Sequence, residues 1–338
     1  MRTRLALLLA PLLAPLLAPV LAPLVLACLP NAALAQAVFP TPGKLIRIVV
    51  PFPAGGQTDI QARLLAAKLQ PALGVTVLVD NKPGASSILG TMEVVRAQAD
   101  GHTLLYTISN TAAQNPHLFS KLPYDPLKDL TPVMFAARSS TVLTVPAASP
   151  FNSVADLVKF AKANPGKLNY ASYSLGSTSH LVAELMQQAT GTQMTHIPFK
   201  GSADAGMALM GGQVDFLFDG PTTALANARA GKVKMLAFTD PKPYAALGSL
   251  PNMAQAGVPG VDVTGGMQFF GPRNLPPEVL TKLNAALATA LKDPEVAKVY
   301  ADGASEIVAS SAPEHAASVK EQYERWGGVI RKLGLKLD

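Results

Sequence analysis

Cysteine is almost absent from the sequence. The only one among 338 residues is Cys28, which lies within an apolar run from Leu5 to Leu29 near the N-terminus. If export removes that run, the mature chain has no thiol. Disulfides, thiol catalysis and cysteine-ligated metals are then excluded, and the apolar core must supply the stability.

Aromatic residues are also scarce, at 6% of the chain, and basic residues are scattered instead of forming a stripe. Nucleic-acid binding needs a basic surface and aromatic stacking positions, so we expect no nucleic-acid partner. The chain has 28 basic and 22 acidic residues, a net charge of +6, which falls to +4 without Arg2 and Arg4. This mild positive excess suits an anionic ligand.

Short motifs of common enzymes and nucleotide-binding proteins are missing as well. The chain has no P-loop, no G-x-G-x-x-G, no H-E-x-x-H and no G-x-S-x-G. His180 and Glu184 have helical i, i+4 spacing, but no third ligand of suitable spacing accompanies them, so we interpret them as a hydrogen-bonded structural pair. We expect no catalytic residue, no metal and no cofactor.

The N-terminus has the pattern of a secretory signal peptide. Arg2 and Arg4 precede the apolar run, and Ala33-Leu34-Ala35 provides a small-x-small cleavage site. We predict a signal peptide of residues 1–35 and a periplasmic protein. Two alternatives stay open: lipid attachment at Cys28, and an uncleaved membrane anchor, against which the repeated prolines argue.

The mature chain of about 300 residues is long enough for two domains. Short β-branched runs alternate with longer helical periods, a pattern typical of parallel sheets covered by helices. The order of strand, glycine loop and helix first appears after Ile46–Val50 and recurs after Leu168–Ser172. Further predicted strands are Val75–Val79, Thr103–Ile108, Val214–Phe218 and Val233–Phe238, and predicted helices are Leu89–Gln98, Ser177–Gln188, Ala203–Met210, Pro277–Leu291 and Glu314–Leu333.

The C-terminal part is predicted to return to the first lobe. After Pro251 the pattern shows long helical periods and only one short strand, near Ile307. We therefore predict a discontinuous first lobe of residues 36–138 and 247–338, and a second lobe of residues 139–246.

A glycine pair follows the first strand, in the segment Pro51 to Asp59. Glycines between a buried strand and a helix let backbone N–H groups converge beside the positive end of the helix, an arrangement that binds oxyanions. Thr58 or Asp59 is the expected N-cap. The alternative is a tight strand-to-helix turn without a ligand.

A hydroxyl-rich loop, residues 172–180, occupies the equivalent position in the second half. Its serines offer side-chain donors at a helix start, although serine is also an ordinary cap there. Asp219 follows the predicted strand Val214–Phe218 and Lys200 follows the predicted strand Thr195–Phe199, at the carboxyl edge where open α/β sheets bind ligands. In the alternative interpretation Asp219 caps the next helix and Lys200 points into solvent.

Together these segments resemble the periplasmic receptors of tripartite tricarboxylate transporters, also called the Bug family. The resemblance includes IRIVVPFPAGGQTD at 46–59, DNKPGA at 80–85, DGHTLL at 100–105 and LPYDP at 122–126, and continues through 176–181, 198–201, 211–215 and 256–260. It implies an α/β type II periplasmic-binding-protein clamshell, in which crossover segments join two βαβ lobes around a ligand cleft.

The resemblance also implies a small carboxylate ligand, transporter subunits as partners and a monomeric mature protein without enzyme activity. Loops matching 52–59 and 172–178 would bind the ligand largely through backbone N–H groups and ordered water. From loop position and resemblance the candidate ligand-binding residues are Phe52, Ala54, Gly55, Gly56, Gln57, Thr58, Asp59, Ser109, Ser172, Ser174, Gly176, Ser177, Thr178, Lys200 and Asp219.

The chain departs from the family pattern in a few places. Ser86-Ser87 replaces glycine-rich sequence, Phe199 replaces a common tyrosine, and residues 264–269 lack the usual tryptophan. We expect these changes to open or de-polarise part of the cleft, so that a bulkier or aromatic acid is tolerated. Two other functions remain as alternatives: a ligand-sensing receptor that feeds a signalling system, and a periplasmic hydrolase using Ser177 and His180.

Overall fold

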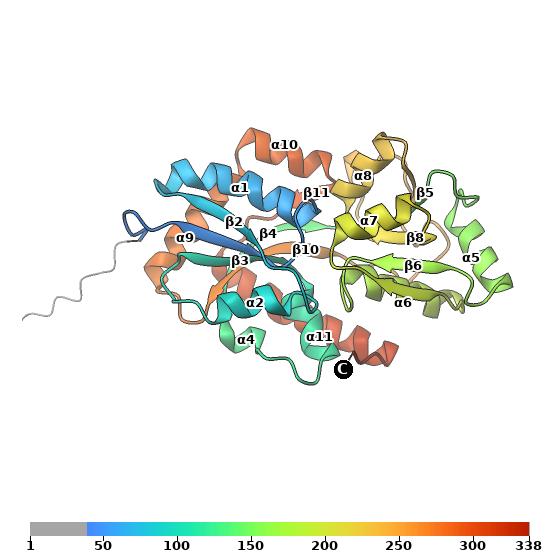
Figure 1. Ribbon diagram of the computed structural model, residues 1–338, viewed down its shortest axis with the longest axis horizontal. Coiled ribbons are helices and arrows are strands. Elements are labelled where there is room, and N and C mark those ends of the chain that lie inside the picture. The colour runs from blue at the N-terminus through green and yellow to red at the C-terminus, as the bar shows by residue number, and fades with distance from the viewer. Residues whose placement is uncertain (1–38, 338) are drawn as a thin grey trace, which may run out of the picture. The chain divides into compact units, whose positions relative to one another are not determined.

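Two β-sheets organise the chain in this computed structural model, which describes residues 39–337 (Figure 1). The first sheet has the order β11 (Ser305–Ile307), β4 (Leu130–Ser139), β10 (Gly265–Pro272), β3 (Thr103–Ile108), β1 (Ile46–Val50) and β2 (Val77–Asn81). The second has the order β7 (Thr195–Pro198), β6 (Asn169–Ser172), β8 (Phe216–Asp219), β5 (Val142–Pro146) and β9 (Val233–Phe238). The predicted signal peptide and Cys28 lie outside the described residues.

Both sheets are mixed, so the parallel pairing predicted from the sequence describes only part of each sheet. β1 pairs in parallel with β2 and β3, and β6 pairs in parallel with β7 and β8. β10 runs antiparallel to both β3 and β4, and β5 runs antiparallel to β8 and β9. The predicted α/β class and the two βαβ series are confirmed, and antiparallel strands join them.

β4 and β10 were missing from the sequence prediction, although they lie in the middle of the first sheet. β4 contains Pro132, and β10 begins with Gly265-Gly266 and ends in Gly271-Pro272. Glycine and proline normally indicate turns or edge strands. Here Gly266 is required by packing, because an added Cβ would lie 2.0 Å from a ring carbon of Phe135.

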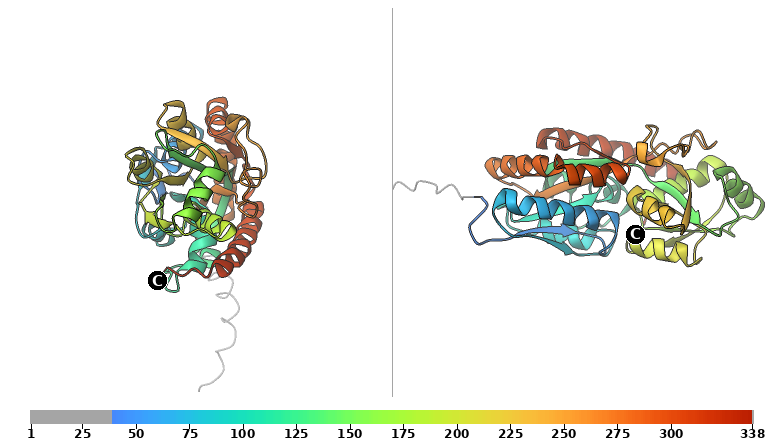
Figure 2. Two further views of the ribbon diagram at one scale, coloured as in Figure 1. Left: turned by 90° about the vertical axis from the view of Figure 1, so that its right-hand side faces the viewer. Right: turned by 90° about the horizontal axis from the view of Figure 1, so that it is seen from above.

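Helices cover both faces of each sheet (Figure 2). The helices packed on the first sheet are α1 (Gln57–Leu73), α2 (Ile88–Val95), α9 (Pro277–Leu291), α10 (Pro294–Asp302) and part of α11 (Ala312–Leu333). Those on the second sheet are α5 (Val154–Ala163), α6 (Thr178–Thr190), α7 (Ser202–Met210) and α8 (Pro221–Arg229). Shorter helical segments are η2 (Asn110–Gln114), α3 (Asn115–Leu118), α4 (Pro126–Asp129) and η3 (Ala245–Leu247). No helix in the described range is both long and apolar enough to cross a bilayer.

Strand alternation explains how one sheet supports two apolar layers. In β1 the side chains of Ile46 and Ile48 join the core formed with α1 and α9, whereas Val49 joins the core formed with α2 and α11. All three are fully buried. Successive residues of a strand point to opposite faces, so a fully apolar strand is buried on both sides.

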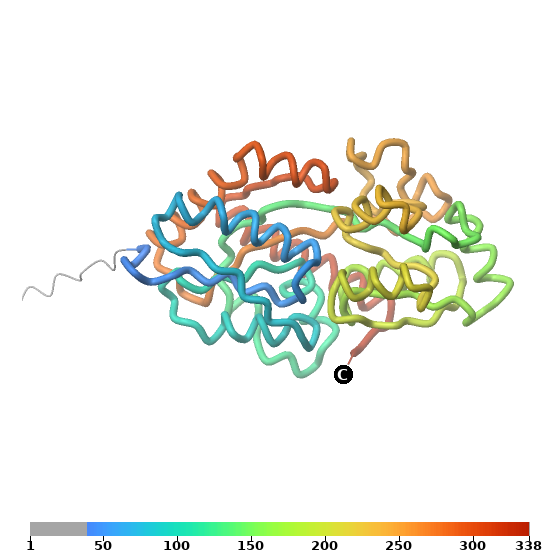
Figure 3. Tube along the Cα trace, turned by 45° about the horizontal axis from the view of Figure 1, so that its top comes forward, coloured from blue at the N-terminus to red at the C-terminus, as the bar shows by residue number. Residues whose placement is uncertain are grey.

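The chain passes between the sheets at the β4–β5 junction and again before β10 (Figure 3). α11 also contacts both cores, since Val319 packs with the first sheet while Trp326 and Ile330 pack with the second. Residues between 253 and 263 likewise belong to the core of the second sheet. The predicted lobe boundaries at 138/139 and 246/247 stay predictions.

Alanine substitutions at two adjacent glycines of α11 are expected to change the free energy of unfolding in opposite directions. An added Cβ at Gly328 meets nothing within 4 Å, so Gly328→Ala is expected to raise the free energy of unfolding by about 1 kcal/mol through helix propensity. At Gly327 the Cβ would lie 2.7 Å from the His117 ring, so Gly327→Ala should destabilise. Urea denaturation of both variants checks this. Equal effects would contradict the packing described for His117.

A left-handed turn precedes α2. Ala85, Ser86 and Ser87 have φ values of 45°, 53° and 73°, a region that strongly favours glycine. Because Ala85 is exposed, Ala85→Gly is expected to stabilise the protein by about 1 kcal/mol by relieving strain. Ala189→Gly, at an exposed position of α6, is the control and should destabilise it by a similar amount. Denaturant melts that show destabilisation by both variants would contradict a strained turn.

Candidate functional site

A pocket with a cavity volume of about 50 Å³ lies where the two sheets meet. The first sheet contributes the loop before α1, the end of β4 and the start of β10, and the second contributes the loops that begin α6, α7 and α8. The lining residues are Phe52, Pro53, Gly56, Gln57, Thr58, Asp59, Ile108, Ser139, Ser140, Thr141, Tyr173, Thr178, Ser202, Gly220, Gly265, Gly266 and Met267.

Part of the predicted site lies in this lining. The predicted residues that line the pocket are Phe52, Gly56, Gln57, Thr58, Asp59 and Thr178. Ala54, Gly55 and Lys200 are exposed and do not line it. Ser109, Ser172, Ser174, Gly176, Ser177 and Asp219 are buried outside the lining. The binding roles of all these residues stay predictions.

The hydroxyl-rich crossover Ser139–Thr141 and the glycine pair Gly265-Gly266 with Met267 also line the pocket, although they were not predicted as site residues. The crossover begins at the last residue of β4 and the glycine pair opens β10, and neither strand was predicted from the sequence. Tyr173 lies within the predicted hydroxyl-rich loop and Ser202 lies two residues after Lys200, and their position after predicted strands was the signal that could have found them. Phe199 packs against a core of the second sheet and does not line the pocket, and the expected effect of its difference from the family pattern stays a prediction.

Four helices begin beside the pocket without a side-chain cap. Their N-caps are Gly56 of α1, Ser177 of α6, Gly201 of α7 and Gly220 of α8. By contrast, Ser153, Asp293 and Ser311 cap α5, α10 and α11 with their side chains. First-turn amides have no intrahelical acceptor, so uncapped helix starts leave donors for an anion.

Thr58 and Asp59 are not N-caps, which corrects the prediction. α1 begins earlier, at Gln57, so both residues lie in its first turn. The Asp59 carboxylate instead accepts hydrogen bonds from Gly55 N at 2.9 Å, Arg63 Nε at 3.1 Å and Asn81 Nδ2 at 3.0 Å. Burial alone would raise the pKa of Asp59, but these hydrogen bonds lower it overall. Asp59 therefore stays ionised and fixes the glycine loop, and the Gly55 N–H is not free for a ligand.

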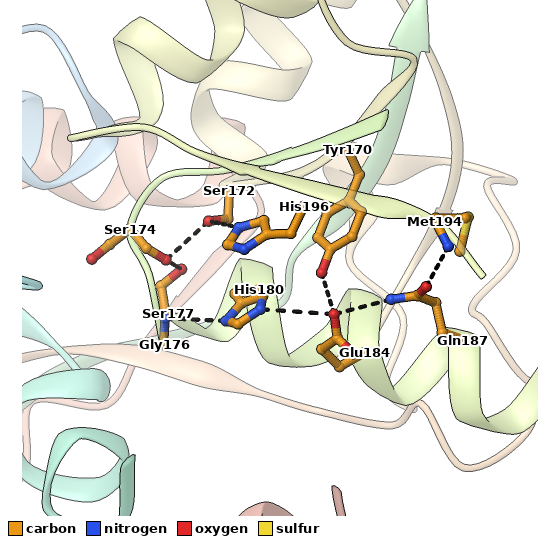
Figure 4. Close-up of polar contacts among 10 residues, drawn as sticks. All are labelled: Tyr170, Ser172, Ser174, Gly176, Ser177, His180, Glu184, Gln187, Met194 and His196. Carbon is orange, nitrogen blue, oxygen red and sulfur yellow. Dashed lines mark hydrogen bonds and ion pairs between the residues drawn. The ribbon is translucent and has the colours of Figure 1, made fainter. Parts of the chain in front are cut away.

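The hydroxyl-rich loop is held by its own hydrogen bonds (Figure 4). Ser172 Oγ and Ser177 Oγ donate to Ser174 O at 2.9 and 2.6 Å, and Ser172 Oγ also pairs with His196 Nε2 at 2.7 Å. Gly176 N donates to His180 Nδ1 at 3.2 Å. These hydrogen bonds support the loop, and the predicted ligand-binding roles of its residues stay predictions.

The buried His180 and the half-buried His196 stack beneath this loop (Figure 4). The ring centroids of His180 and His196 lie 3.9 Å apart with an interplanar angle of 10°. His180 Nε2 lies 3.7 Å from Glu184 Oε1, and Glu184 also accepts from Tyr170. Burial lowers the pKa of His180 to about 4, so both the loop contact and the stack use neutral imidazole.

The geometry does not support a hydrolase built from Ser177 and His180. The Ser177 hydroxyl donates to Ser174 O, and His180 Nδ1 already accepts from Gly176 N. The nucleophile and the base therefore lack the hydrogen bond that activates a serine. Within residues 39–337 no group of three or more His, Cys, Asp or Glu side chains is arranged to hold a metal ion.

Asp219 lies outside the pocket lining and sets the direction in which the Ser202 hydroxyl donates its hydrogen bond. Ser202 Oγ donates to Asp219 Oδ1 at 2.6 Å, and Gly220 N and Thr223 Oγ1 donate at 2.8 and 2.7 Å. Burial raises the pKa of Asp219 to about 6 despite these bonds. When Asp219 is ionised, Ser202 directs its proton away from the pocket and presents an acceptor to it.

No lysine or arginine belongs to the pocket lining, and Asp59 is its only charged residue. An anion in this cavity must therefore be bound by backbone N–H groups, hydroxyls and the positive ends of helices. The side chains of Phe52, Ile108 and Met267 provide an apolar part of the same wall.

Comparison with known proteins identifies a family for this fold and pocket. Residues 61–335 match the tripartite tricarboxylate transporter family receptor. Protein BugT of Bordetella pertussis is 33% identical over 297 residues, which cover 88% of this chain and 91% of BugT.

Solved structures agree with this result. A Rhodopseudomonas palustris protein solved with adipate has 34% sequence identity and a TM-score of 0.84, covering 87% of this chain and 99% of its own. MatC from the same organism, solved with malate, has 30% identity and a TM-score of 0.81, covering 86% and 100%. The predicted two-lobe periplasmic-binding architecture is confirmed, and the chain belongs to the tripartite tricarboxylate transporter family of receptors, as the resemblance indicated.

Proposed function

We propose that this protein is a periplasmic receptor that captures a small carboxylate between its two sheets and delivers it to a tripartite tricarboxylate-type transporter. The observation that carries the proposal is the convergence of uncapped helix starts from both sheets on one pocket without a cationic side chain. Backbone N–H groups at helix starts stabilise carboxylates. Adipate and malate in the two related structures support this ligand class.

We propose that capture occurs by closure of two lobes, residues 36–138 with 247–338 and residues 139–246. The loops before α1 and α7 already face each other: a Cβ on Gly201 would lie 2.6 Å from Pro53 Cδ, and one on Gly56 would lie 3.6 Å from Ser202 Cβ. A ligand that contacts both loops favours the closed form through its differential affinity.

The mature receptor in this proposal is a monomeric, non-catalytic periplasmic protein. Export would use residues 1–35 as a cleaved signal peptide, with lipid attachment at Cys28 as the alternative. Intact-mass measurement of protein purified from the periplasm distinguishes the two, because cleavage after Ala35 removes the only cysteine.

Thermal-shift screening of the purified protein against mono-, di- and tricarboxylates, including aromatic acids, tests the proposed function. A ligand that binds only the folded state raises the melting temperature in a saturable way, and chromatography should recover the ligand unchanged. If no carboxylate stabilises the protein after removal of any copurified ligand by partial unfolding and refolding, the carboxylate proposal is wrong. Consumption of a ligand would instead indicate an enzyme.

A further inference from the structure

We infer that the ligand carries, besides its carboxylate, a neutral group that both donates and accepts hydrogen bonds, and that Gln57 recognises this group. The inference rests on the proposed function and narrows its substrate class to short carboxylates with a carboxamide or hydroxyl. Gln57 is 4% exposed and lines the pocket, yet neither its Oε1 nor its Nε2 has a hydrogen-bond partner among the described residues. Native proteins rarely leave a buried amide unpaired at both ends.

The position of Gln57 suits it to contact a bound ligand at closure. It is the first residue of α1, and its side chain extends to the start of α8. A Cβ on Gly220 would lie 2.1 Å from Gln57 Oε1, so the amide directly faces the second sheet's side of the pocket. A ligand held there meets one donor and one acceptor of the same side chain.

A second unpaired group faces the same cavity. Ser140 Oγ, in the crossover between β4 and β5, is 2% exposed, lines the pocket and has no partner within the described chain. Ser202 adds an acceptor when its proton is directed to Asp219. The unpaired groups in the lining, the Gln57 amide and the Ser140 hydroxyl, are therefore neutral and can both donate and accept hydrogen bonds.

The charges around these groups argue against a second carboxylate at this end of the ligand. Asp59, an anion in the lining, and Asp219, directly behind Ser202, both add negative charge, and no lysine or arginine lines the cavity. A carboxylate can accept a hydrogen bond from Gln57 Nε2 but has no proton to donate to Gln57 Oε1, so it would leave that oxygen unpaired. A carboxamide or hydroxyl pairs with both ends of the amide, while Phe52 and Met267 contact the carbon skeleton.

Calorimetric titration of two matched ligand series tests the inference. The four-carbon series is succinamate, 4-hydroxybutyrate, succinate and butyrate, and the six-carbon series is adipamate, 6-hydroxyhexanoate, adipate and hexanoate. In at least one series we expect the amide or hydroxyl acid to bind about tenfold or more tightly than both the diacid and the unsubstituted acid. Diacids that bind best in both series overturn this inference and leave the receptor proposal intact. Failure of all eight acids to bind also overturns it, and the receptor proposal then depends on the wider carboxylate panel.

The variant Gln57→Met separates recognition from packing. It removes both polar atoms at similar size, so we expect the preference for amide or hydroxyl acids to fall to within about twofold, with little change for the unsubstituted acid. Without ligand the variant should melt at the same or a higher temperature, because no unpaired amide remains buried. Gln70→Met, at an exposed position of the same helix, is the control and should change no affinity. A Gln57→Met protein that keeps the preference, or loses affinity for all acids equally, contradicts the assignment.

Discussion

Gly201→Ala is expected to weaken carboxylate binding at least about tenfold, because it prevents full closure of the cleft. Gly201 has an extended backbone, with φ of −174°, so alanine is not strained there. Its Cβ, however, would lie 2.6 Å from Cδ and 3.1 Å from Cγ of Pro53, across the cleft. A proline ring has little freedom to move away, so the methyl group should hold the two loops apart.

Gly206→Ala is the matched control for this variant. It lies in the same helix, and its added Cβ would make only an ordinary contact, 3.8 Å from Asn227 Nδ2. Calorimetry should show wild-type affinity for Gly206→Ala and reduced affinity for Gly201→Ala, with both variants folded by circular dichroism. Wild-type affinity in Gly201→Ala would show that binding does not require the loops to approach as they do here.

The free energy of unfolding is expected to fall by several kcal/mol as the pH decreases from about 7 to 4. Burial lowers the pKa of His180 to about 4 and of His315 to about 3, and burial together with the charge of His180 lowers that of His196 to about 3. Between these values and the unfolded value near 6.5, the unfolded chain binds more protons, so stability is lost as the pH falls. His180 alone accounts for about 3 kcal/mol.

Asp219 acts in the opposite direction. Burial raises its pKa to about 6, so between about pH 6 and 3.8 the folded chain holds a proton that the unfolded chain has released, and the destabilisation caused by burying the Asp219 carboxylate diminishes as the pH falls. The three histidines together outweigh this single group. Urea denaturation at a series of pH values measures the net slope.

His180→Asn isolates one contribution to that slope. Its side-chain oxygen can replace Nδ1 as the acceptor for Gly176 N but does not titrate. The variant should therefore lose less stability than the wild type between pH 7 and 4. An unchanged slope would show that His180 is not held neutral by the folded state.

Local sequence patterns predicted much of the fold, because several strands and helices have a regular spacing of apolar residues without interrupting glycine or proline. The strands Ile46–Val50, Thr103–Ile108 and Val233–Phe238 and the helix Pro277–Leu291 lie where they were expected. β4 and β10 were missed because Pro132 and Gly265-Gly266 resemble turn residues, whereas their place in the sheet depends on contacts with distant strands.

In the site, too, features that depend on contacts in the folded structure could not be predicted from local sequence. Position at strand ends indicated Gly56, Gln57 and Thr178 as pocket residues. The sequence could not show that Asp59 would occupy the Gly55 N–H, or that His180 would occupy that of Gly176. Which donors remain free is decided by side chains one helical turn away, whose orientation depends on the folded structure.

A crystal structure of the protein with the tightest carboxylate from the screen tests the central claim most directly. We predict one ligand per chain in the pocket between the two sheets, with its carboxylate at the first-turn amides of α1 or α6 and with Gly201 packed against Pro53. A carboxylate bound outside this pocket, or held by lysine or arginine side chains, would contradict the account.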